Sequence, residues 1–306
     1  MTVAVAFTLL AICINHLVSG NINSKDCGVN SELEEQADST KFIVNGQSTP
    51  GPGSWPWMCS VGFLTSEVWE HQCGGALVTY SHVLTAAHCL KKFEEQGRED
   101  RIKVRCGDFH LMESTDDGGV QVLDVSRYDM HEGYNFPNYD ISVLVMKTIF
   151  KASNFTRPIC LDNSTQDDSM DVLLVLGWGM DSNGERGMKL NRAKLQIQDP
   201  DYCKAAVETV IGFDDDLFCA EDQALEGSGS CYGDSGGPAF AFNSVLWRYE
   251  LRGLVSGGAA PQQCGEFGVP SIFTSTSFDG IYRWISEKQK EKIGELFSVK
   301  HSDVSH

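Results

Sequence analysis

The chain has 306 residues, of which 42% are hydrophobic and 22% are charged. This composition excludes a disordered or fibrous chain, and the length suffices for one large domain or two small ones with a sizeable buried core. The formal net charge of −18 makes DNA and other polyanions poor partners, so we expect an acidic globular protein that binds no nucleic acid.

The first segment, residues 1–20, reads as a secretory signal peptide. It is apolar, too short and too interrupted to span a membrane, and ends in Val18-Ser19-Gly20, which resembles a signal-peptidase site. The chain also has eleven cysteines, a number that indicates an oxidising compartment. No later apolar run approaches the roughly 20 residues of a membrane span. We expect a secreted, extracellular protein without a membrane segment; a buried N-terminal helix is the alternative for this segment.

The rest of the chain divides into a polar leader, a long β-type region and a C-terminal helix. Residues 21–42 are polar and acidic and have little to bury. From Ile43 to about residue 280, short apolar or alternating runs are broken by Gly, Pro, Asn and Asp, which predicts an all-β barrel or sandwich; examples are residues 75–80, 120–125, 172–176 and 251–255. Residues 281–297 carry apolar side chains at helical spacing, and the last six residues are expected to fray.

Two Asn-X-Thr triplets begin at Asn154 and Asn163. Such triplets often arise by chance, but in a secreted chain they are acceptor sites for glycans on surface loops. We expect glycosylation at both asparagines.

Three local motifs carry chemistry. The run Leu84-Thr85-Ala86-Ala87-His88-Cys89 places a histidine after an apolar stretch, and Asp140 begins an apolar strand. The run Cys231-Tyr232-Gly233-Asp234-Ser235-Gly236-Gly237 places a serine in a glycine-rich loop. A lone histidine is usually a core residue and a lone aspartate a turn residue. Together, Ser235, His88 and Asp140 supply a nucleophile, the base that removes its proton and a carboxylate that orients the base.

With these motifs, the sequence from Ile43 to about Ile285 resembles the trypsin/chymotrypsin family of serine proteases, and within it the chymotrypsin-like members. The resemblance implies an all-β fold of two packed six-stranded antiparallel β-barrels with a C-terminal helix. It also implies a serine endopeptidase in which His88 is the general base, Asp140 orients it and Ser235 attacks the peptide bond.

The resemblance assigns further residues around this triad. The amides of Gly233 and Ser235 would form the oxyanion hole, and Ser256 would hydrogen-bond Asp140. The expected partners are polypeptide substrates, with protein inhibitors of proteases as candidates, and we expect a monomer without a cofactor.

Many relatives bind calcium in the loop that here runs from residue 108 to 119. This loop offers the carboxylates of Glu113, Asp116 and Asp117, but their spacing does not match the calcium-binding pattern. We therefore favour a solvated acidic loop and no metal.

Ile43-Val44-Asn45-Gly46 resembles the new N-terminus that this family exposes on activation. In that scheme the freed ammonium of Ile43 pairs with buried Asp234, so the uncut precursor should be nearly inactive. The family usually has Arg or Lys before this isoleucine, whereas here Phe42 follows Lys41. We therefore predict cleavage between Phe42 and Ile43 by a chymotrypsin-like enzyme, with self-activation as one option.

The substrate pocket implied by the resemblance has no fixed charge at its base. Gly229 stands six positions before Ser235, where an aspartate would select Lys or Arg. We expect cleavage after large apolar residues (Phe, Tyr, Leu, Met). Glu266 could still supply a negative charge to this pocket. Gly257 stands where the family usually has a Trp that supports the substrate backbone. The remaining pocket residues would be Ser230, Cys231, Tyr232, Ser256, Gly258 and, at the back, Ser271.

Cys13 falls in the signal segment, which leaves ten cysteines. The resemblance pairs Cys73 with Cys89, Cys203 with Cys219, Cys231 with Cys264, and Cys27 with Cys160, the last keeping the leader attached after activation. Cys59 and Cys106 remain; they correspond to neighbouring strands of the first barrel, and we predict an additional bridge. Leu173 and Ala241 stand where many relatives have a disulfide, so we expect apolar packing there.

The expected organisation is thus a signal peptide (1–20), a propeptide (21–42) tethered by a disulfide, and a peptidase domain with a helical tail (43–306). A non-catalytic homologue that binds partners through the same fold is the alternative. The presence of the whole triad together with Asp234 favours an active enzyme. The leader contains no evident adaptor module, which favours digestion or general proteolysis over a cascade, venom or immune role.

Overall fold

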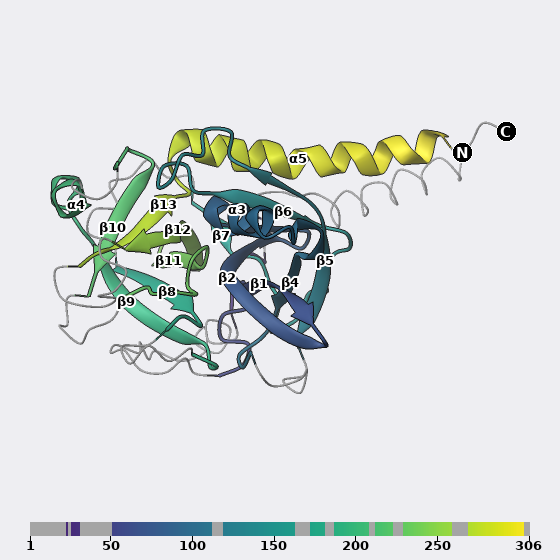
Figure 1. Ribbon diagram of the computed structural model, residues 1–306, viewed down its shortest axis with the longest axis horizontal. Coiled ribbons are helices and arrows are strands. Elements are labelled where there is room, and N and C mark those ends of the chain that lie inside the picture. The colour runs from purple at the N-terminus through teal and green to yellow at the C-terminus, as the bar shows by residue number, and fades with distance from the viewer. Residues whose placement is uncertain are drawn as a thin grey trace.

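The structure is a computed structural model that describes residues 23, 26–30, 51–111, 119–162, 172–180, 187–207, 212–222, 229–258 and 269–302, without the side chains of 291–302. Several predicted features lie outside these residues: the signal peptide, the cleavage site at Phe42–Ile43, the acidic loop residues 113–117, Asn163, Cys264 and Glu266. In the described part of the chain, no helix combines the length and the apolar character needed to cross a membrane. Figure 1 shows two β-barrels side by side, with one long helix running along them.

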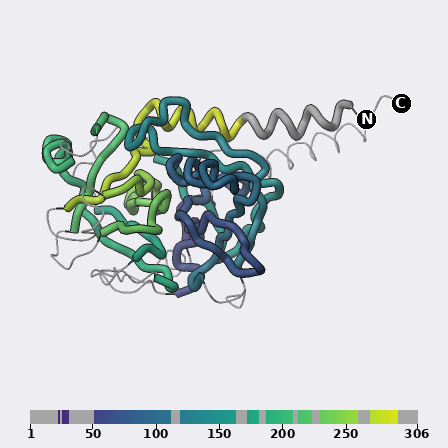
Figure 2. The backbone as a smooth tube through the Cα atoms, in the orientation of Figure 1, coloured from purple at the N-terminus to yellow at the C-terminus, as the bar shows by residue number. Residues whose placement is uncertain are grey.

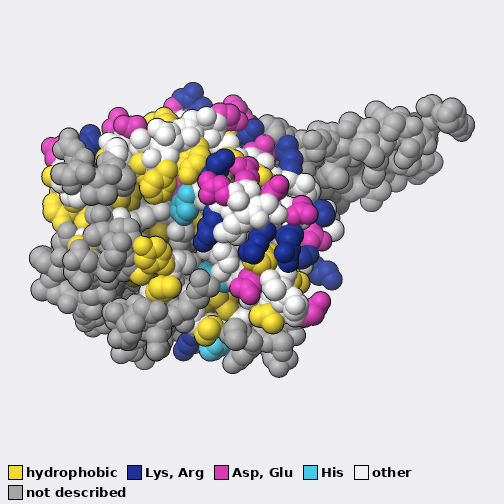
Figure 3. Space-filling view, viewed as in Figure 1, with side chains coloured by type: hydrophobic (Ala, Val, Ile, Leu, Met, Phe, Trp, Pro, Cys, Tyr) yellow, Lys and Arg dark blue, Asp and Glu magenta, His cyan; other side chains and the backbone are white. Residues whose placement is uncertain are grey.

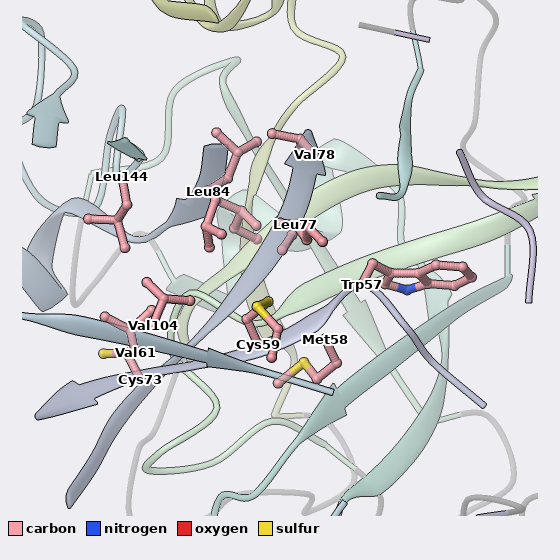
Figure 4. Close-up of a cluster of buried hydrophobic side chains, with 14 of the residues drawn as sticks. Trp57, Met58, Cys59, Val61, Cys73, Leu77, Val78, Leu84, Val104 and Leu144 are labelled. Carbon is pink, nitrogen blue, oxygen red and sulfur yellow. A yellow bond between two sulfur atoms is a disulfide. The ribbon is translucent and has the colours of Figure 1, made fainter. Parts of the chain in front are cut away.

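The first barrel is closed by six antiparallel strands in the order β1-β2-β3-β6-β5-β4. Val, Leu and Cys side chains from these strands converge on its interior, as Figure 4 shows for Val61, Leu77 and Val104. Such β-branched and apolar residues suit a pleated, half-buried surface. The strands are β1 (Met58–Thr65), β2 (Val68–Thr79), β3 (His82–Thr85), β4 (Lys103–Cys106), β5 (Gln121–Met130) and β6 (Ser142–Met146), with α3 (Ala87–Glu95) and the short 3₁₀ helix η1 (Glu99–Arg101) between β3 and β4.

The second barrel is a ring of six antiparallel strands in the order β11-β8-β9-β10-β13-β12, closed by the pairing of β11 with β12. A seventh strand, β7 (Cys160–Leu161), pairs in parallel with β12 outside the ring. The other elements are β8 (Val172–Gly177), β9 (Asn191–Ile197), α4 (Pro200–Val207), β10 (Leu217–Glu221), β11 (Pro238–Asn243), β12 (Arg248–Gly258) and β13 (Ser271–Ser275). The predicted pair of six-stranded barrels is confirmed. The additional strand β7 was not predicted, because a strand of two residues leaves no recognisable pattern in the sequence.

The interior of the second barrel contains the expected apolar contact in place of a disulfide. Leu173 and Ala241 are buried in one cluster with Val175, Leu195 and Phe273. Since well-packed interiors leave few voids, aliphatic side chains fill the volume that a bridge would occupy.

The C-terminal helix α5 (Asp279–Ser302) starts on the body of the molecule (Figures 1 and 2) and extends beyond it (Figure 1). Its first turns bury Ile281, Trp284 and Ile285 in the large core cluster that also contains the first-barrel residues. The predicted helix is therefore present, and its apolar face attaches it to the core.

Four disulfides join described cysteines: Cys27–Cys160, Cys59–Cys106, Cys73–Cys89 and Cys203–Cys219. Cys231 is also disulfide-bonded, but its expected partner lies outside the described residues. Cys59 and Cys106 face each other across β1 and β4, so this bridge joins two neighbouring strands. In the chain-entropy model, closing a loop of that size contributes about 4 kcal/mol to stability.

The leader is fixed to the body by more than its disulfide. The amide of Gly28 donates to the carbonyl of Pro158 at 2.9 Å, and the amide of Tyr249 donates to the carbonyl of Gly28 at 2.8 Å. A side chain at Gly28 would lie 2.2 Å from the Tyr249 oxygen, so only glycine permits this approach. Residues 26–30 of the leader are thus part of the folded domain.

Candidate active site

His88 and Asp140 meet in the first barrel. His88 lies in the first turn of α3, directly after β3, and Asp140 lies two residues before β6, which pairs with β3. Asp140 Oδ2 lies 2.7 Å from His88 Nδ1, and its Oδ1 accepts the His88 backbone amide at 2.8 Å. Because the Asp140 carboxylate can only accept a hydrogen bond, His88 Nδ1 carries the proton of the neutral imidazole. Nε2 is then unprotonated and can act as a base.

The second barrel supplies a further donor to this aspartate. Ser256 Oγ donates to Asp140 Oδ2 at 2.6 Å, and Thr274 Oγ1 donates to the Asp140 carbonyl at 3.3 Å. Asp140 is fully buried, so the hydrogen bonds that Ser256 and His88 donate to its carboxylate stabilise the charge in place of water. The carboxylate therefore depends on groups from both barrels.

Ser235 lies in the tight glycine-rich loop before β11. Gly236 has a φ of 75°, and a side chain there would lie 2.2 Å from Thr85 Oγ1. The Ser235 carbonyl accepts the Gly74 amide at 2.8 Å, which holds the loop against β2. Ser235 and His88 line the same cleft. The contacts of the described residues include no hydrogen bond between these two side chains, as is common in substrate-free proteases.

The peptide between Gly233 and Asp234 is held by a chain of buried polar groups that the sequence did not reveal. His71 Nε2 donates to the Gly233 carbonyl at 2.9 Å, and Ser60 Oγ lies 2.7 Å from His71 Nδ1. Trp69 Nε1 donates to Ser60 Oγ at 2.8 Å. With the φ of 103° at Gly233, these contacts fix the orientation of the loop beside Ser235.

Asp234 is nearly buried under the same loop. Its two oxygens accept the amides of Gly179 at 2.7 Å and Cys231 at 2.9 Å. Burial raises the pKa of Asp234 to about 6, although both amide hydrogen bonds lower it. Among the described residues no cation pairs with this carboxylate.

A cleft of about 600 Å³ opens between the barrels beside the triad. Seven of the eight predicted pocket residues line it: Ser230, Cys231, Tyr232, Ser256, Gly257, Gly258 and Ser271. Gly229 is described, but it is not among the lining residues. The lining residues in the described part of the chain include no Asp or Glu, and a Cβ on Gly257 or Gly258 would have no neighbour nearer than 3.9 Å. As far as the described residues line it, the cleft is therefore open and free of negatively charged side chains.

Phe136 is a cleft residue that the sequence analysis missed. Its ring packs edge-on against His88 with centroids 5.8 Å apart, and its Cζ is the nearest atom to a Cβ built on Gly257. It therefore occupies part of the space that the family's Trp would fill. The loop before Asp140 carries three aromatic residues, Tyr134, Phe136 and Tyr139, and the sequence does not indicate which of them packs against His88. Other lining residues not predicted are Gln72, Lys92, Tyr134, Met180, Val255, Val269 and Pro270.

One grouping of metal-ligand atoms occurs in the described part of the chain, at Cys73, His88 and Cys89. The two cysteines are joined as a disulfide, so they cannot act as thiolate ligands. The group therefore offers a single imidazole, which does not make a metal site.

Comparison with known proteins agrees with this geometry. The trypsin family model matches residues 43–285. Serine protease 28 of Mus musculus is 32% identical over 247 residues, covering 76% of this chain and 84% of the relative. Chymotrypsin-C of Rattus norvegicus is 30% identical over 250 residues, covering 80% and 88%. Among solved structures, neuropsin, a serine protease expressed in the limbic system of mouse brain, superposes with a TM-score of 0.64 at 26% identity, covering 80% of this chain and 99% of that one. With a fold of two barrels and a cleft between them, the chain belongs to the trypsin family of serine endopeptidases.

Proposed function

We propose that the chain hydrolyses peptide bonds through His88, Asp140 and Ser235. The observation that carries the proposal is the double contact of buried Asp140 with the backbone and the ring of His88, beside Ser235 in the cleft. Ser235 Oγ would attack the carbonyl carbon while His88 Nε2 takes its proton. The carbon–nitrogen bond then breaks, the proton passes to the leaving amine, and water hydrolyses the acyl-enzyme by the same steps.

The amides of Gly233 and Ser235 would bind the negative oxygen that forms during attack. The support for this role is the fixed conformation of the loop: His71 Nε2 donates to the Gly233 carbonyl, and both Gly233 and Ser235 line the cleft. Loss of one such donor typically costs about 3 kcal/mol of transition-state stabilisation.

Activation would follow cleavage between Phe42 and Ile43. The supporting observation is Asp234, a nearly buried carboxylate that accepts two backbone amides and has its pKa raised by burial. The new ammonium of Ile43 would supply the missing positive charge and fix the loop that carries Ser235. The leader would stay attached through Cys27–Cys160.

The primary specificity would be for large apolar residues. The cleft walls contributed by Ser230, Gly257 and Gly258 carry no charge, and a basic substrate side chain would lose hydration there without gaining a described counter-ion. Phe42 itself fits this preference, so the enzyme would be able to cut its own precursor.

Secretion is proposed from the apolar first twenty residues together with the disulfides. The exposed side chain of Asn154 is available to a glycan. The enzyme would act as an extracellular monomer on polypeptide substrates, with protein inhibitors as candidate regulators.

A fluorophosphonate probe tests the proposed function, because it reacts with a serine only where that serine is activated. We expect strong labelling of chain processed at Phe42–Ile43, weak labelling of the precursor, and none of Ser235→Ala. Ser244→Ala, at an exposed turn between β11 and β12, is the matched control and should label fully. A processed, folded chain that does not label would instead be the non-catalytic homologue.

A further inference from the structure

The residue before Asp140 has an unusual backbone conformation. Tyr139 has a φ of 51°, in the left-handed region that is unfavourable for a residue with a large side chain. The amide of Ile141 donates to the Tyr139 carbonyl at 2.8 Å, which makes a three-residue turn centred on Asp140. Since Tyr139 and Asp140 share a peptide bond, the conformation of Tyr139 directs the Asp140 side chain.

Asp216, in the second barrel, holds this conformation. It lies directly before β10, and its Oδ2 accepts the Tyr139 amide at 2.6 Å. Its own carbonyl accepts the amide of Ser275, at the end of β13, at 2.8 Å. Only 1% of Asp216 is exposed, and its other carboxylate oxygen has no hydrogen-bond partner among the described residues. The only other residue whose hydrogen bond to this buried carboxylate is seen in the described part of the chain is therefore Tyr139.

The Tyr139 ring is held separately. It stacks on His131 with centroids 4.7 Å apart and an interplanar angle of 11°, and Phe278 packs against it at 6.3 Å. His131 in turn contacts Trp284 of α5 at 5.0 Å. The ring contacts fix the side chain, but they leave the peptide plane at the Tyr139 amide to be set by Asp216.

We propose that Asp216 is a positioning residue, which acts through the Tyr139 turn to aim the Asp140 carboxylate at His88. The proposal rests on the proposed function of the triad. Removal of the acceptor would leave a half-buried amide unpaired in an unfavourable conformation, so the turn would relax and Asp140 would lose its double contact with His88. The pocket residues Ser230, Gly257 and Gly258 lie elsewhere in the second barrel, so binding of the substrate side chain should be spared.

The test compares Asp216→Leu with Asp216→Asn in the processed, full-length enzyme. Leucine removes the acceptor, whereas the asparagine carbonyl can still accept the Tyr139 amide. Asp215→Leu, at the exposed neighbouring position, is the matched control. We expect Asp216→Leu to lower kcat at least about tenfold with KM within about twofold, and Asp216→Asn to keep kcat within about threefold of wild type. Asp215→Leu should match wild type.

Rates are normalised to the active fraction that a fluorophosphonate probe labels in each preparation. If wild type does not label, the proposed function fails; if wild type labels and Asp216→Leu keeps its kcat, only the positioning role is overturned. Equal losses in the Leu and Asn variants, or a rise in KM as large as the fall in kcat, also overturn it. Should Asp216→Leu not fold, Asp216→Ser, whose hydroxyl is too short to reach the amide, takes its place with the same expectations.

Discussion

Ser256 Oγ, on β12 of the second barrel, donates a hydrogen bond of 2.6 Å to Asp140 Oδ2, at the entry of β6 in the first barrel. Both residues are buried, so water cannot replace this donor. The orientation of the His88 ring therefore depends on how the two barrels pack against each other.

Ser256→Ala should accordingly reduce kcat/KM without unfolding the protein. Loss of one donor to a buried carboxylate costs about 1–3 kcal/mol, which corresponds to a roughly 5- to 150-fold lower rate. The measurement is hydrolysis of a peptide substrate by active-site-titrated enzyme. Ser126→Ala is the control, since its hydroxyl bonds the Val145 carbonyl on the first barrel. Equal rates for Ser256→Ala and Ser126→Ala would show that the contact has no role in catalysis.

The raised pKa of Asp234 predicts that the stability of the uncut chain depends on pH. Its pKa is about 6 in the folded chain and ordinarily 3.8, so the folded precursor retains a proton that the unfolded chain releases between these values. The contribution of this carboxyl to stability is therefore complete below about pH 4 and is lost as the pH rises through 6, by about 3 kcal/mol.

Urea unfolding of Ser235→Ala precursor, which cannot digest itself, measures this effect. Adding Asp234→Asn removes one of the two acceptors at every pH, but the amide carries no charge to bury, so its effect on stability should be more favourable at pH 7 than at pH 4. An effect of the substitution that is the same at both pH values would contradict a buried, uncompensated Asp234.

The proposed cleavage site between Phe42 and Ile43 predicts which protease can activate the chain. Trypsin should cut wild type after Lys41 and leave Phe42 as the N-terminus, one residue too long to place the Ile43 ammonium at Asp234. In Phe42→Arg, trypsin should release Ile43 and generate activity. N-terminal sequencing and peptidase assays measure both outcomes, and wild type that is fully active with Phe42 at its N-terminus would refute the scheme.

The open space around Gly258 predicts how a larger side chain at this position would change the substrate specificity. A Cβ on this residue would meet no atom closer than the Pro270 carbonyl at 4.0 Å, so a small side chain fits without disturbing the fold. Gly258→Val should narrow the entrance and lower kcat/KM for a Phe substrate by about 100-fold or more while sparing an Ala substrate, since lost binding of an aromatic ring amounts to about 3 kcal/mol. An unchanged Phe-to-Ala ratio would place the specificity pocket elsewhere.

The sequence was most informative where function is concentrated in short runs. His88 and Ser235 each stand in a local motif, and the pairing of Cys59 with Cys106 followed from the family's strand arrangement. Phe136 and Asp216 had no such signal, because their roles come from contacts made only when distant segments fold together. Gly229 was assigned by position relative to Ser235, but whether it lines the cleft depends on the path of the loop, which sequence spacing does not determine.

The distribution of charge over the surface could not be predicted from the sequence either. A net charge of −18 suggests a uniformly acidic exterior, yet on the face in Figure 3 Lys and Arg side chains alternate with Asp and Glu over the first barrel, while hydrophobic side chains gather toward the second. Net charge is a sum over the whole chain, so it could not predict how the two signs are distributed.

The most direct test of the triad is to trap its covalent intermediate. Processed enzyme is mixed with an ester substrate whose deacylation is slow, quenched in acid, and its intact mass is measured before peptide mapping. A working triad predicts a mass increase of one acyl group located on Ser235, greatly reduced in His88→Ala. An acyl group on any other residue, or turnover without one, would contradict it.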